Sequence, residues 1–337
     1  MHYIGLDVHS KHFTAAVVDE QGRLLFRSTH PTSEHNLIEV VSSLQGRKRV
    51  AFEETTVAGW VYRTLRSVTE DVIVTDPRLN QWISRDADMD DDKAALRLAN
   101  LARGNFVQRV HHTDDQTQAV FKELVLGHKK VSKELARAKN QLKAKFRQHG
   151  IVCDGDGVYS PAHAEDWLAK LKDEDSRFQA RRYMRRIGHL TEEKQAYARR
   201  IAKRARAFPQ IAAFEALPGI GIIRAATFFA IIDTPHRFAN KRKLWTYCGL
   251  GIAHFSSDQM RGPVKLNPNG NRMLKELAKN AAQDAVRQGN NPFARHYQRL
   301  LANGVKSSCA MLTVARAIVA TMWAMWRKDE TYIPRAD

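Results

Sequence analysis

The stretch Tyr3–Asp19, YIGLDVHSKHFTAAVVD, decides the fold of the first part of this chain. It holds two runs that favour β-strands, Tyr3–Leu6 and Phe13–Val18, and polar residues separate them. Asp7 lies at the end of the first run, where an apolar residue would cost less to bury. A lone acid at a strand end is also a common turn residue, so Asp7 by itself identifies no chemistry. We place the other candidate residues relative to Asp7.

The composition makes a polyanion the expected partner. The chain has 337 residues, of which 43% are apolar, and 54 Lys and Arg against 36 Asp and Glu give a formal net charge of +18. The length and apolar content predict two domains with hydrophobic cores. The basic excess predicts attraction to nucleic acid, DNA or RNA, through phosphate neutralisation. A basic surface that only faces solvent is the alternative.

Three further features narrow the class of protein. No apolar run approaches the ~20 residues that a membrane span needs, and the N-terminus lacks the apolar core of a signal peptide. We therefore expect a soluble cytoplasmic protein without a membrane partner. Cys153, Cys248 and Cys309 are odd in number and far apart, which predicts neither a disulfide framework nor a cysteine zinc site.

Strand and helix patterns alternate after Asp7. We expect a strand at 24–28, a helix capped by Ser33, a strand at 48–53, a helix at 60–65 and a strand at 71–74. This βββαβαβ order, with a helix to follow, predicts an α/β sheet with helices on its faces. Acids at the strand ends can then meet in one cleft.

An Asp-rich segment begins the next predicted helix, over residues 85–105. Five Asp residues occupy the seven positions from Asp86 to Asp92, and apolar residues then recur with helical spacing. The macrodipole at a helix start favours negative charge, which accounts for one or two of these acids. Five acids repel one another unless a cation or a basic partner offsets the repulsion.

Residues 116–207 read as a helical region between two domains. A long helix over 116–149 carries one apolar stripe in eleven-residue repeats, typical of an antiparallel coiled coil or a dimer arm; the stripe is Val120, Leu124, Val131, Leu135, Leu142 and Phe146. Its basic opposite face fits a phosphate backbone or only solvent. Further helices are expected around Trp167 and from Thr191, the predicted N-cap of a basic helix that ends at Pro209.

Two motifs mark the C-terminal region. Gly219 and Gly221 lie in a tight turn between two predicted helices, the pattern of a helix-hairpin-helix whose backbone N–H groups face DNA phosphate. An ordinary packing hairpin is the alternative. After a helix over 238–250, a polar segment combines serines with basic groups, which suits phosphate binding or a nucleophile aimed at phosphate; its members include Ser256, Ser257, Arg261, Lys265 and Arg272. A last helix is expected over 305–326.

Five motifs in this order resemble one family. They are GLDVHSK, FEETT, DDDKAALRLANLARGNF, LPGIG and an S-x(5)-G-x(7)-G-N-x-x-L run over 256–274. Together they resemble the insertion-sequence transposases of the IS110 and IS1111 type, over essentially the whole chain. The resemblance implies a RuvC-like, ribonuclease-H-like N-terminal domain with a DEDD acid set and a C-terminal domain that carries a serine. It also implies a bacterial, bridge-RNA- or seek-RNA-guided DNA recombinase that works as a dimer or tetramer.

The resemblance assigns the first two acids and the serine. The first acid falls on Asp7 and the second on Glu53, with Glu54 as the neighbouring alternative. The serine of the family falls on Ser256, with Ser257 one step away.

The last acid pair departs from the family pattern. A D-x-x-D-A-x-x-L-A run puts the third acid at Asp91 and the fourth at Ala94, which has no metal-binding oxygen. Either the chain is altered at a catalytic position, which we favour, or Asp88 with Asp91, or Asp92 alone, supplies the ligands. In the first case the chain as written is inactive or severely impaired.

The implied chemistry is phosphoryl transfer with two Mg²⁺ ions held by carboxylates and with serine attack on DNA. The expected domains are a RuvC-like DEDD domain at 1–112, a helical coiled-coil linker at 113–207 and a serine transposase domain with a helix-hairpin-helix at 208–337. Expected partners are target and donor DNA and a structured non-coding guide RNA. The rival functions are a non-catalytic nucleic-acid-binding protein and a Holliday-junction nuclease that uses water.

Overall fold

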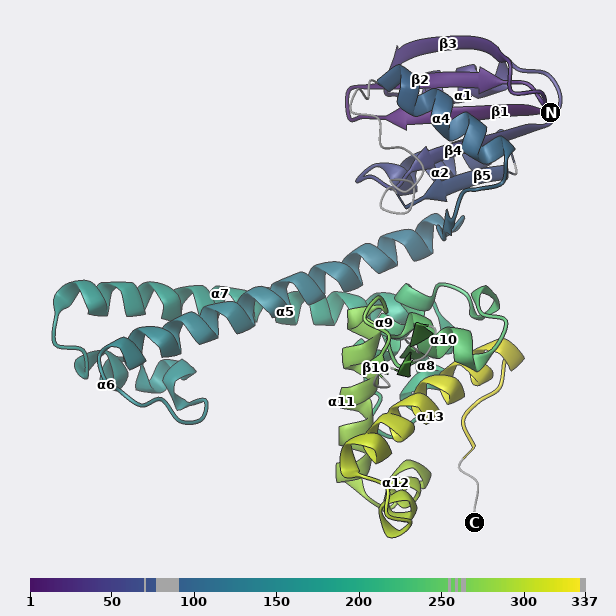
Figure 1. Ribbon diagram of the computed structural model, residues 1–337. Coiled ribbons are helices and arrows are strands. Elements are labelled where there is room, and N and C mark those ends of the chain that lie inside the picture. The colour runs from purple at the N-terminus through teal and green to yellow at the C-terminus, as the bar shows by residue number, and fades with distance from the viewer. Residues whose placement is uncertain (70, 77–90, 254–255, 258–259, 262–264, 334–337) are drawn as a thin grey trace. The chain divides into compact units, whose positions relative to one another are not determined.

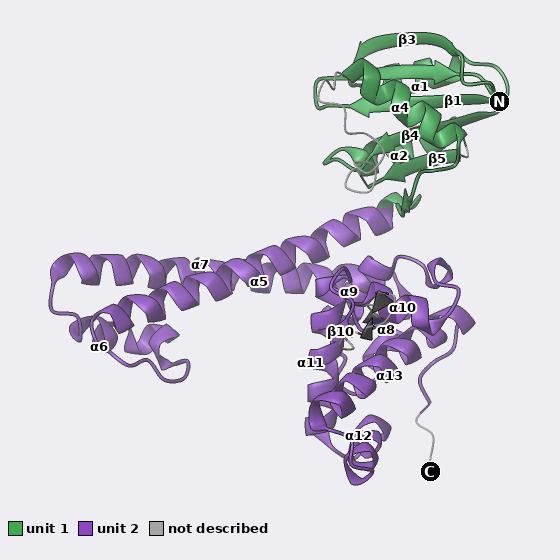
Figure 2. Ribbon diagram, in the orientation of Figure 1, with its two compact units in different colours: residues 1–116 green, residues 117–337 purple. Residues whose placement is uncertain are grey.

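The computed structural model describes residues 1–69, 71–76, 91–253, 256–257, 260–261 and 265–333. The chain forms two compact units, residues 1–116 and 117–337 (Figure 2). The first unit is a mixed α/β structure and the second is mainly helical (Figure 1). The predicted combination of an α/β part with a helical part is confirmed, whereas the three domain boundaries stay a prediction.

A six-stranded sheet in the order β3-β2-β1-β4-β5-β6 forms the centre of unit 1. Its strands are β1 (His2–Val8), β2 (His12–Val18), β3 (Leu24–Pro31), β4 (Lys48–Glu53), β5 (Asp71–Thr75) and β6 (Arg109–Val110). β2 pairs antiparallel with β1, whereas β4 pairs parallel with β1 and β5 parallel with β4. The C-terminal ends of β1, β4 and β5 therefore lie at one edge of the sheet.

The two faces of the sheet differ because side chains alternate along each strand. Ile4, Leu6 and Val8 of β1 join an apolar cluster with α1 (Glu34–Ser42) and α2 (Ala58–Arg66). Ser33 caps α1 as predicted, since its hydroxyl accepts a hydrogen bond from the Asn36 amide. The other face carries α4 (Asp91–Arg103), which crosses β1 and β2 (Figure 1).

Gly5 allows α4 to lie directly on β1. A Cβ atom at residue 5 would lie 2.0 Å from the Ala95 carbonyl oxygen and 2.4 Å from the Ala99 amide nitrogen. Ala95 and Ala99 are themselves fully buried. Small residues on both elements thus set the close approach, which brings Asp91 in the first turn of α4 to the end of β1.

A pair of long antiparallel helices begins unit 2. α5 (Gln116–Gln148) and α7 (Glu174–Ala205) share an apolar cluster that includes Leu135, Leu142, Phe146, Ile187 and Leu190 (Figure 1). The connection between them contains the short helix α6 (Ala164–Ala169). Gly127 of α5 leaves space for a side chain of α7, since a Cβ atom there would lie 2.6 Å from the ring of Tyr197.

The buried stripe of α5 differs from the prediction at its start. Phe121 and Val125 are buried, whereas the predicted Val120 is 37% exposed. Phe121 packs against Phe208 and Phe229 in the C-terminal core, so this aromatic contact sets the rotation of the helix here.

The predicted helix start at Thr191 is wrong. The Thr191 hydroxyl donates a hydrogen bond to the Ile187 carbonyl inside α7, which is continuous through this position. Threonine can bond to the carbonyl four residues earlier, and this satisfies its hydroxyl within a helix. The N-cap of α7 is Asp173, whose carboxylate accepts from the Ser176 amide.

Six described helices, joined by Phe121 of α5 and Ile201 of α7, form the core of the C-terminal part. They are α8 (Pro209–Glu215), α9 (Ile222–Ile232), α10 (Lys241–Tyr247), α11 (Arg272–Gln288), α12 (Pro292–Ala302) and α13 (Ser307–Lys328). Among the described helices, α13 is long and apolar enough to count as a candidate membrane span, although no such run was expected. Its side chains at Val314, Ile318 and Met322 pack in this core, which explains the apolar composition.

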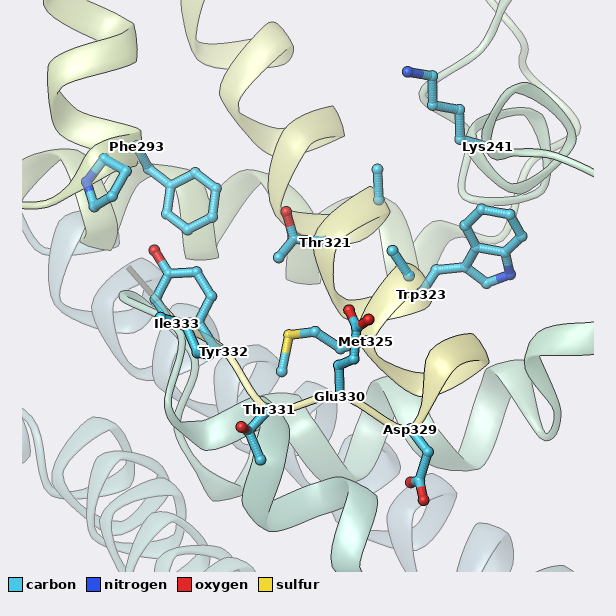
Figure 3. Close-up of a pocket in the computed structure, with 13 residues that line it drawn as sticks. Lys241, Phe293, Thr321, Trp323, Met325, Asp329, Glu330, Thr331, Tyr332 and Ile333 are labelled. Atoms are coloured by element: carbon cyan, nitrogen blue, oxygen red, sulfur yellow. The ribbon is translucent and has the colours of Figure 1, made fainter. Parts of the chain in front are cut away.

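The chain after α13 folds back over α12 and α13. The Tyr332 ring stacks on the Phe293 ring with centroids 6.3 Å apart. A cavity of about 850 Å³ lies beside them, with Trp323 and Met325 of α13 in its wall (Figure 3).

Gly5→Ala should destabilise unit 1, because the added methyl group meets the backbone of α4. We expect a loss of roughly 3 kcal/mol, at the upper end for overpacking. Hydrogen exchange of β1 and α4 amides in the full chain would measure it. Gly59→Ala is the control: its Cβ would lie 3.4 Å from the flexible Arg63 side chain in α2, so stability should be unchanged or higher. Equal protection in both variants would contradict the close contact.

Candidate active site

Three side chains from different elements converge at the C-terminal end of β1. Asp7 of β1, His9 of the following turn and Asp91 of α4 each offer a ligand atom, and these atoms lie within 4.8 Å of one another. His9 Nε2 is 3.4 Å from Asp7 Oδ2 and 3.6 Å from Asp91 Oδ1. The spacing of these atoms suits one small cation.

His12, the first residue of β2, extends the cluster. Its Nε2 atom lies 3.4 Å from Asp91 Oδ2, and its ring centroid is 5.4 Å from that of His9. Both imidazoles are about half exposed, 50% for His9 and 49% for His12. Asp91 therefore has a histidine beside each of its carboxylate oxygens.

Sequence reasoning assigned no role to these two histidines. The signal was present in the hairpin between β1 and β2, where the His9 amide donates to the His12 carbonyl. Val8 pairs with Phe13, so the turn between them holds both histidines at the same end as Asp7. A D-x-H-x-x-H spacing across a tight hairpin would have predicted the cluster.

Glu53 lies at the end of β4 on the same face as Asp7. Leu6 pairs with Phe52 in the parallel register of β1 and β4, so residues 7 and 53 come next on neighbouring strands. The Glu53 charge acts on Asp7 and helps to raise its pKa. Glu54 instead pairs with His112, with 2.7 Å between Oε2 and Nε2. Glu53 thus acts on Asp7 through its charge, whereas Glu54 is paired with His112.

Several effects act on the pKa of Asp7. Burial raises the pKa of its carboxyl group, His9 opposes this effect, and the negative charges of Asp91 and Glu53 raise the pKa further. A divalent cation bound between these groups would offset both the loss of hydration and the repulsion between the acids.

The donor set fits a divalent cation. Carboxylate oxygens suit Mg²⁺ and Mn²⁺, and an imidazole nitrogen suits transition metals better than Mg²⁺. Asp7, Asp91 and His9 would hold such an ion, with Glu53 beside them. One imidazole in the set should favour Mn²⁺ over Mg²⁺.

The other acids proposed for α4 do not join the cluster in the described structure. Asp92 Oδ2 lies 3.1 Å from Arg27 of β3, which balances its charge. Ala94 is half-buried one turn after Asp91 and provides no ligand atom. Asp88 lies outside the described residues. Asp91 is therefore the described acid of this segment that reaches Asp7.

The predicted serine lies in a short hairpin of unit 2. Ser256 and Ser257 form β8, which pairs antiparallel with β9 (Met260–Arg261) and sets Ser256 opposite Arg261. Lys265 begins β10 (Lys265–Leu266), which pairs with β7 (Ile252–Ala253). The backbone alone is described for these serines and basic residues. Arg272 is exposed at the start of α11, where Asn271 provides the cap.

The two glycines of the predicted helix-hairpin-helix have different surroundings. Gly219 has φ of +80°, and a Cβ atom there would lie 2.2 Å from the Ala281 carbonyl oxygen of α11. Packing between the turn and α11 therefore explains Gly219. Gly221 precedes α9, a helix without a side-chain cap, and nothing lies within 4 Å of its Cβ position. The first N–H groups of α9 have space for an acceptor there.

Comparisons match both units to one group of proteins. A family model described as "Transposase", of the DEDD and IS110 type, matches residues 4–151, and the model "Transposase IS116/IS110/IS902 family" matches residues 211–298. The putative transposase y4qE of Sinorhizobium fredii is 21% identical, over 97% of this chain and 88% of its own length. The transposase for insertion sequence element IS1111A of Coxiella burnetii is 22% identical, over 98% of this chain and 90% of its own. The IS116 uncharacterized 44.8 kDa protein of Streptomyces clavuligerus is 28% identical, over 36% of this chain and 30% of its own.

His9→Ala should weaken Mn²⁺ binding by about tenfold or more, because it removes one of three converging ligand atoms. Titration with Mn²⁺ followed by electron paramagnetic resonance measures the affinity without any need for activity. The affinity for Mg²⁺, measured by competition with Mn²⁺, should fall less than the affinity for Mn²⁺. His35→Ala is the matched control, since His35 pairs with Glu39 on α1 and is 84% exposed. Unchanged Mn²⁺ affinity in His9→Ala would exclude His9 as a ligand.

Proposed function

This chain belongs to the insertion-sequence transposases of the IS110 family, and we propose that it is an RNA-guided DNA recombinase with a metal-bound acid cluster and a serine nucleophile. DNA transposition follows from the family. The observation that supports the finer proposal is the convergence of Asp7, His9 and Asp91, with Glu53 on the neighbouring strand.

A RuvC-like fold of unit 1 is part of this proposal. The parallel pairing of β1 and β4 supports it, because two strand-end acids then share one edge of the sheet. The antiparallel α5 and α7 pair is the proposed coiled-coil arm. The turn with Gly219 and Gly221, together with Arg261, Lys265 and Arg272, is the proposed nucleic-acid surface of the C-terminal part. Target and donor DNA, a structured guide RNA and a second or further copy of the chain are the proposed partners.

We assign two roles to the residues of unit 1: some would bind the cation, and another orients one of its ligands. Asp7, Asp91 and His9, with Glu53 beside them, would hold Mg²⁺ or Mn²⁺, which would stabilise charge on the attacking and leaving oxygens. His12 contacts Asp91 and orients its carboxylate, as outer partners of metal ligands do.

Ser256 supplies the proposed nucleophile. Its oxygen would bond to the DNA phosphorus while the bond to the leaving DNA oxygen breaks, and the hydroxyl proton would pass to solvent. The reverse attack by a DNA hydroxyl would rejoin the strand without an external energy source. The backbone register that sets Ser256 opposite Arg261 supports this role, since a guanidinium group suits a phosphate.

Ala94→Asp should raise strand exchange with Mg²⁺ by roughly tenfold or more, because it adds a carboxylate one turn after Asp91 and completes the acid set. The chain as written should be severely impaired. A recombination assay on plasmid substrates with the guide RNA compares the two. Asn100→Asp adds the same charge further along α4 and should have no effect. Equal exchange by the unaltered chain and Ala94→Asp would show that position 94 is not a ligand position.

Ser256→Ala, introduced together with Ala94→Asp, should abolish strand cleavage and exchange and leave nucleic-acid binding nearly intact. The reason is that the substitution removes the attacking oxygen and no charge. Trapping of a covalent protein–DNA adduct on a denaturing gel measures the step directly, and Ser257→Ala serves as the control. Adduct formation that persists in Ser256→Ala and disappears in Ser257→Ala moves the role to Ser257. Cleavage without any adduct would favour a nuclease that uses water.

A further inference from the structure

One side of α7 carries an exposed stripe of aromatic and basic residues. Phe178, Arg182, Arg185, Arg186 and His189 follow the spacing i, i+4, i+7, i+8 and i+11, so they share one helix face. All five are exposed, and Phe178 is 61% exposed. They line a hollow of about 600 Å³. We call these five residues the α7 stripe.

The guanidinium groups of the α7 stripe have no acidic partner among the described residues. Two neighbouring arginines of α7 that are not part of the stripe do have partners. Arg181 pairs with Glu165 at 3.5 Å, and Arg177 donates to the carbonyl groups of Leu171 and Lys172. The positive charge of the stripe is therefore available to an external anion.

An acidic residue lies beyond each end of the α7 stripe. Glu174 lies one turn before Phe178, and Glu193 lies one turn after His189. The stripe spans ~16 Å at the rise of an α-helix. A nucleic-acid strand carries a phosphate roughly every 3.4 Å when stacked and less densely when extended, so this length matches about three to five nucleotides.

An exposed phenylalanine beside three unpaired arginines fits unpaired nucleic acid better than a second copy of the chain. Two stripes placed face to face would oppose unpaired guanidinium groups within a chain of net charge +18, and such like charges cost several kcal/mol. Phosphates accept paired hydrogen bonds from arginine, and unpaired bases stack on aromatic rings. A duplex keeps its bases inside the helix, so it cannot use Phe178 in this way.

We propose that the α7 stripe binds an unpaired segment of nucleic acid, with phosphates on Arg182, Arg185 and Arg186 and a base stacked on Phe178. The proposal rests on the proposed function in one respect, that the protein handles nucleic acid. It adds a binding surface separate from the acid cluster and from the C-terminal motifs.

The test is fluorescence anisotropy of the full chain with short uridine RNA, short thymidine DNA and a DNA duplex, all in EDTA. Phe178→Ala should weaken binding of the single strands by roughly tenfold, the effect of one lost stacking contact, and leave duplex binding unchanged. The triple variant Arg182→Ala, Arg185→Ala, Arg186→Ala should reduce the slope of log affinity against log salt by about 2 for single strands, since each phosphate contributes about 0.7. Tighter binding of RNA or of DNA identifies the source of the segment, and either supports the proposal.

The matched control removes the same charge from the same helix, in the variant Arg199→Ala, Arg200→Ala, Lys203→Ala. These residues are also exposed, so general attraction to the basic protein falls equally. The proposal is overturned if Phe178→Ala and the arginine variant bind single strands no worse than this control. It is also overturned if the two variants change only the molecular mass measured by sedimentation, because the stripe would then mediate contact between copies of the chain. Because EDTA removes divalent cations, the binding measurement does not depend on the metal site. Loss of recombination activity and loss of single-strand binding at the α7 stripe can therefore be told apart.

Discussion

The contact between Gly5 and the backbone of α4 sets the geometry of the candidate active site. Without a Cβ atom at residue 5, the helix lies against β1 at Ala95 and Ala99, and its first turn comes over the strand end. Asp91 reaches Asp7 and His9 through this packing, not through any local feature of the Asp-rich segment. A close backbone contact in the core of unit 1 thus determines where the charged groups meet.

That packing also holds mutually repelling acids together. Asp7 is partly buried, and its burial together with the charges of Asp91 and Glu53 raises the pKa of its carboxyl group. The neighbouring charges are balanced differently, because Asp92 has Arg27 and Glu54 has His112. Asp7, by contrast, lies beside the negative charges of Asp91 and Glu53, an arrangement that a bound cation would favour.

The sequence predicted the sheet better than it predicted the cluster. Strand runs, strand-end acids and Ser33 as a cap are local signals, and the βββαβαβ order followed from them. The choice between Asp91 and Asp92 depends on the rotation of α4 over the sheet, and the histidines depend on the pairing of Val8 with Phe13. The predicted helix start at Thr191 was wrong because a threonine hydroxyl can cap a helix or can donate a hydrogen bond to a carbonyl group within one. Local residue preferences carry none of this tertiary information.

The separation of Gly5 from Ala95 along the chain also orders events during synthesis. The β1–β2 hairpin uses neighbouring residues, so it is available as soon as the first strands have left the ribosome. The helix that carries Asp91 is made much later, and until it docks Asp7 and the two histidines lack their remaining partner. A nascent chain therefore contains Asp7, His9 and His12 before it contains Asp91, so a cation that needs the whole cluster would bind only after α4 has docked on β1.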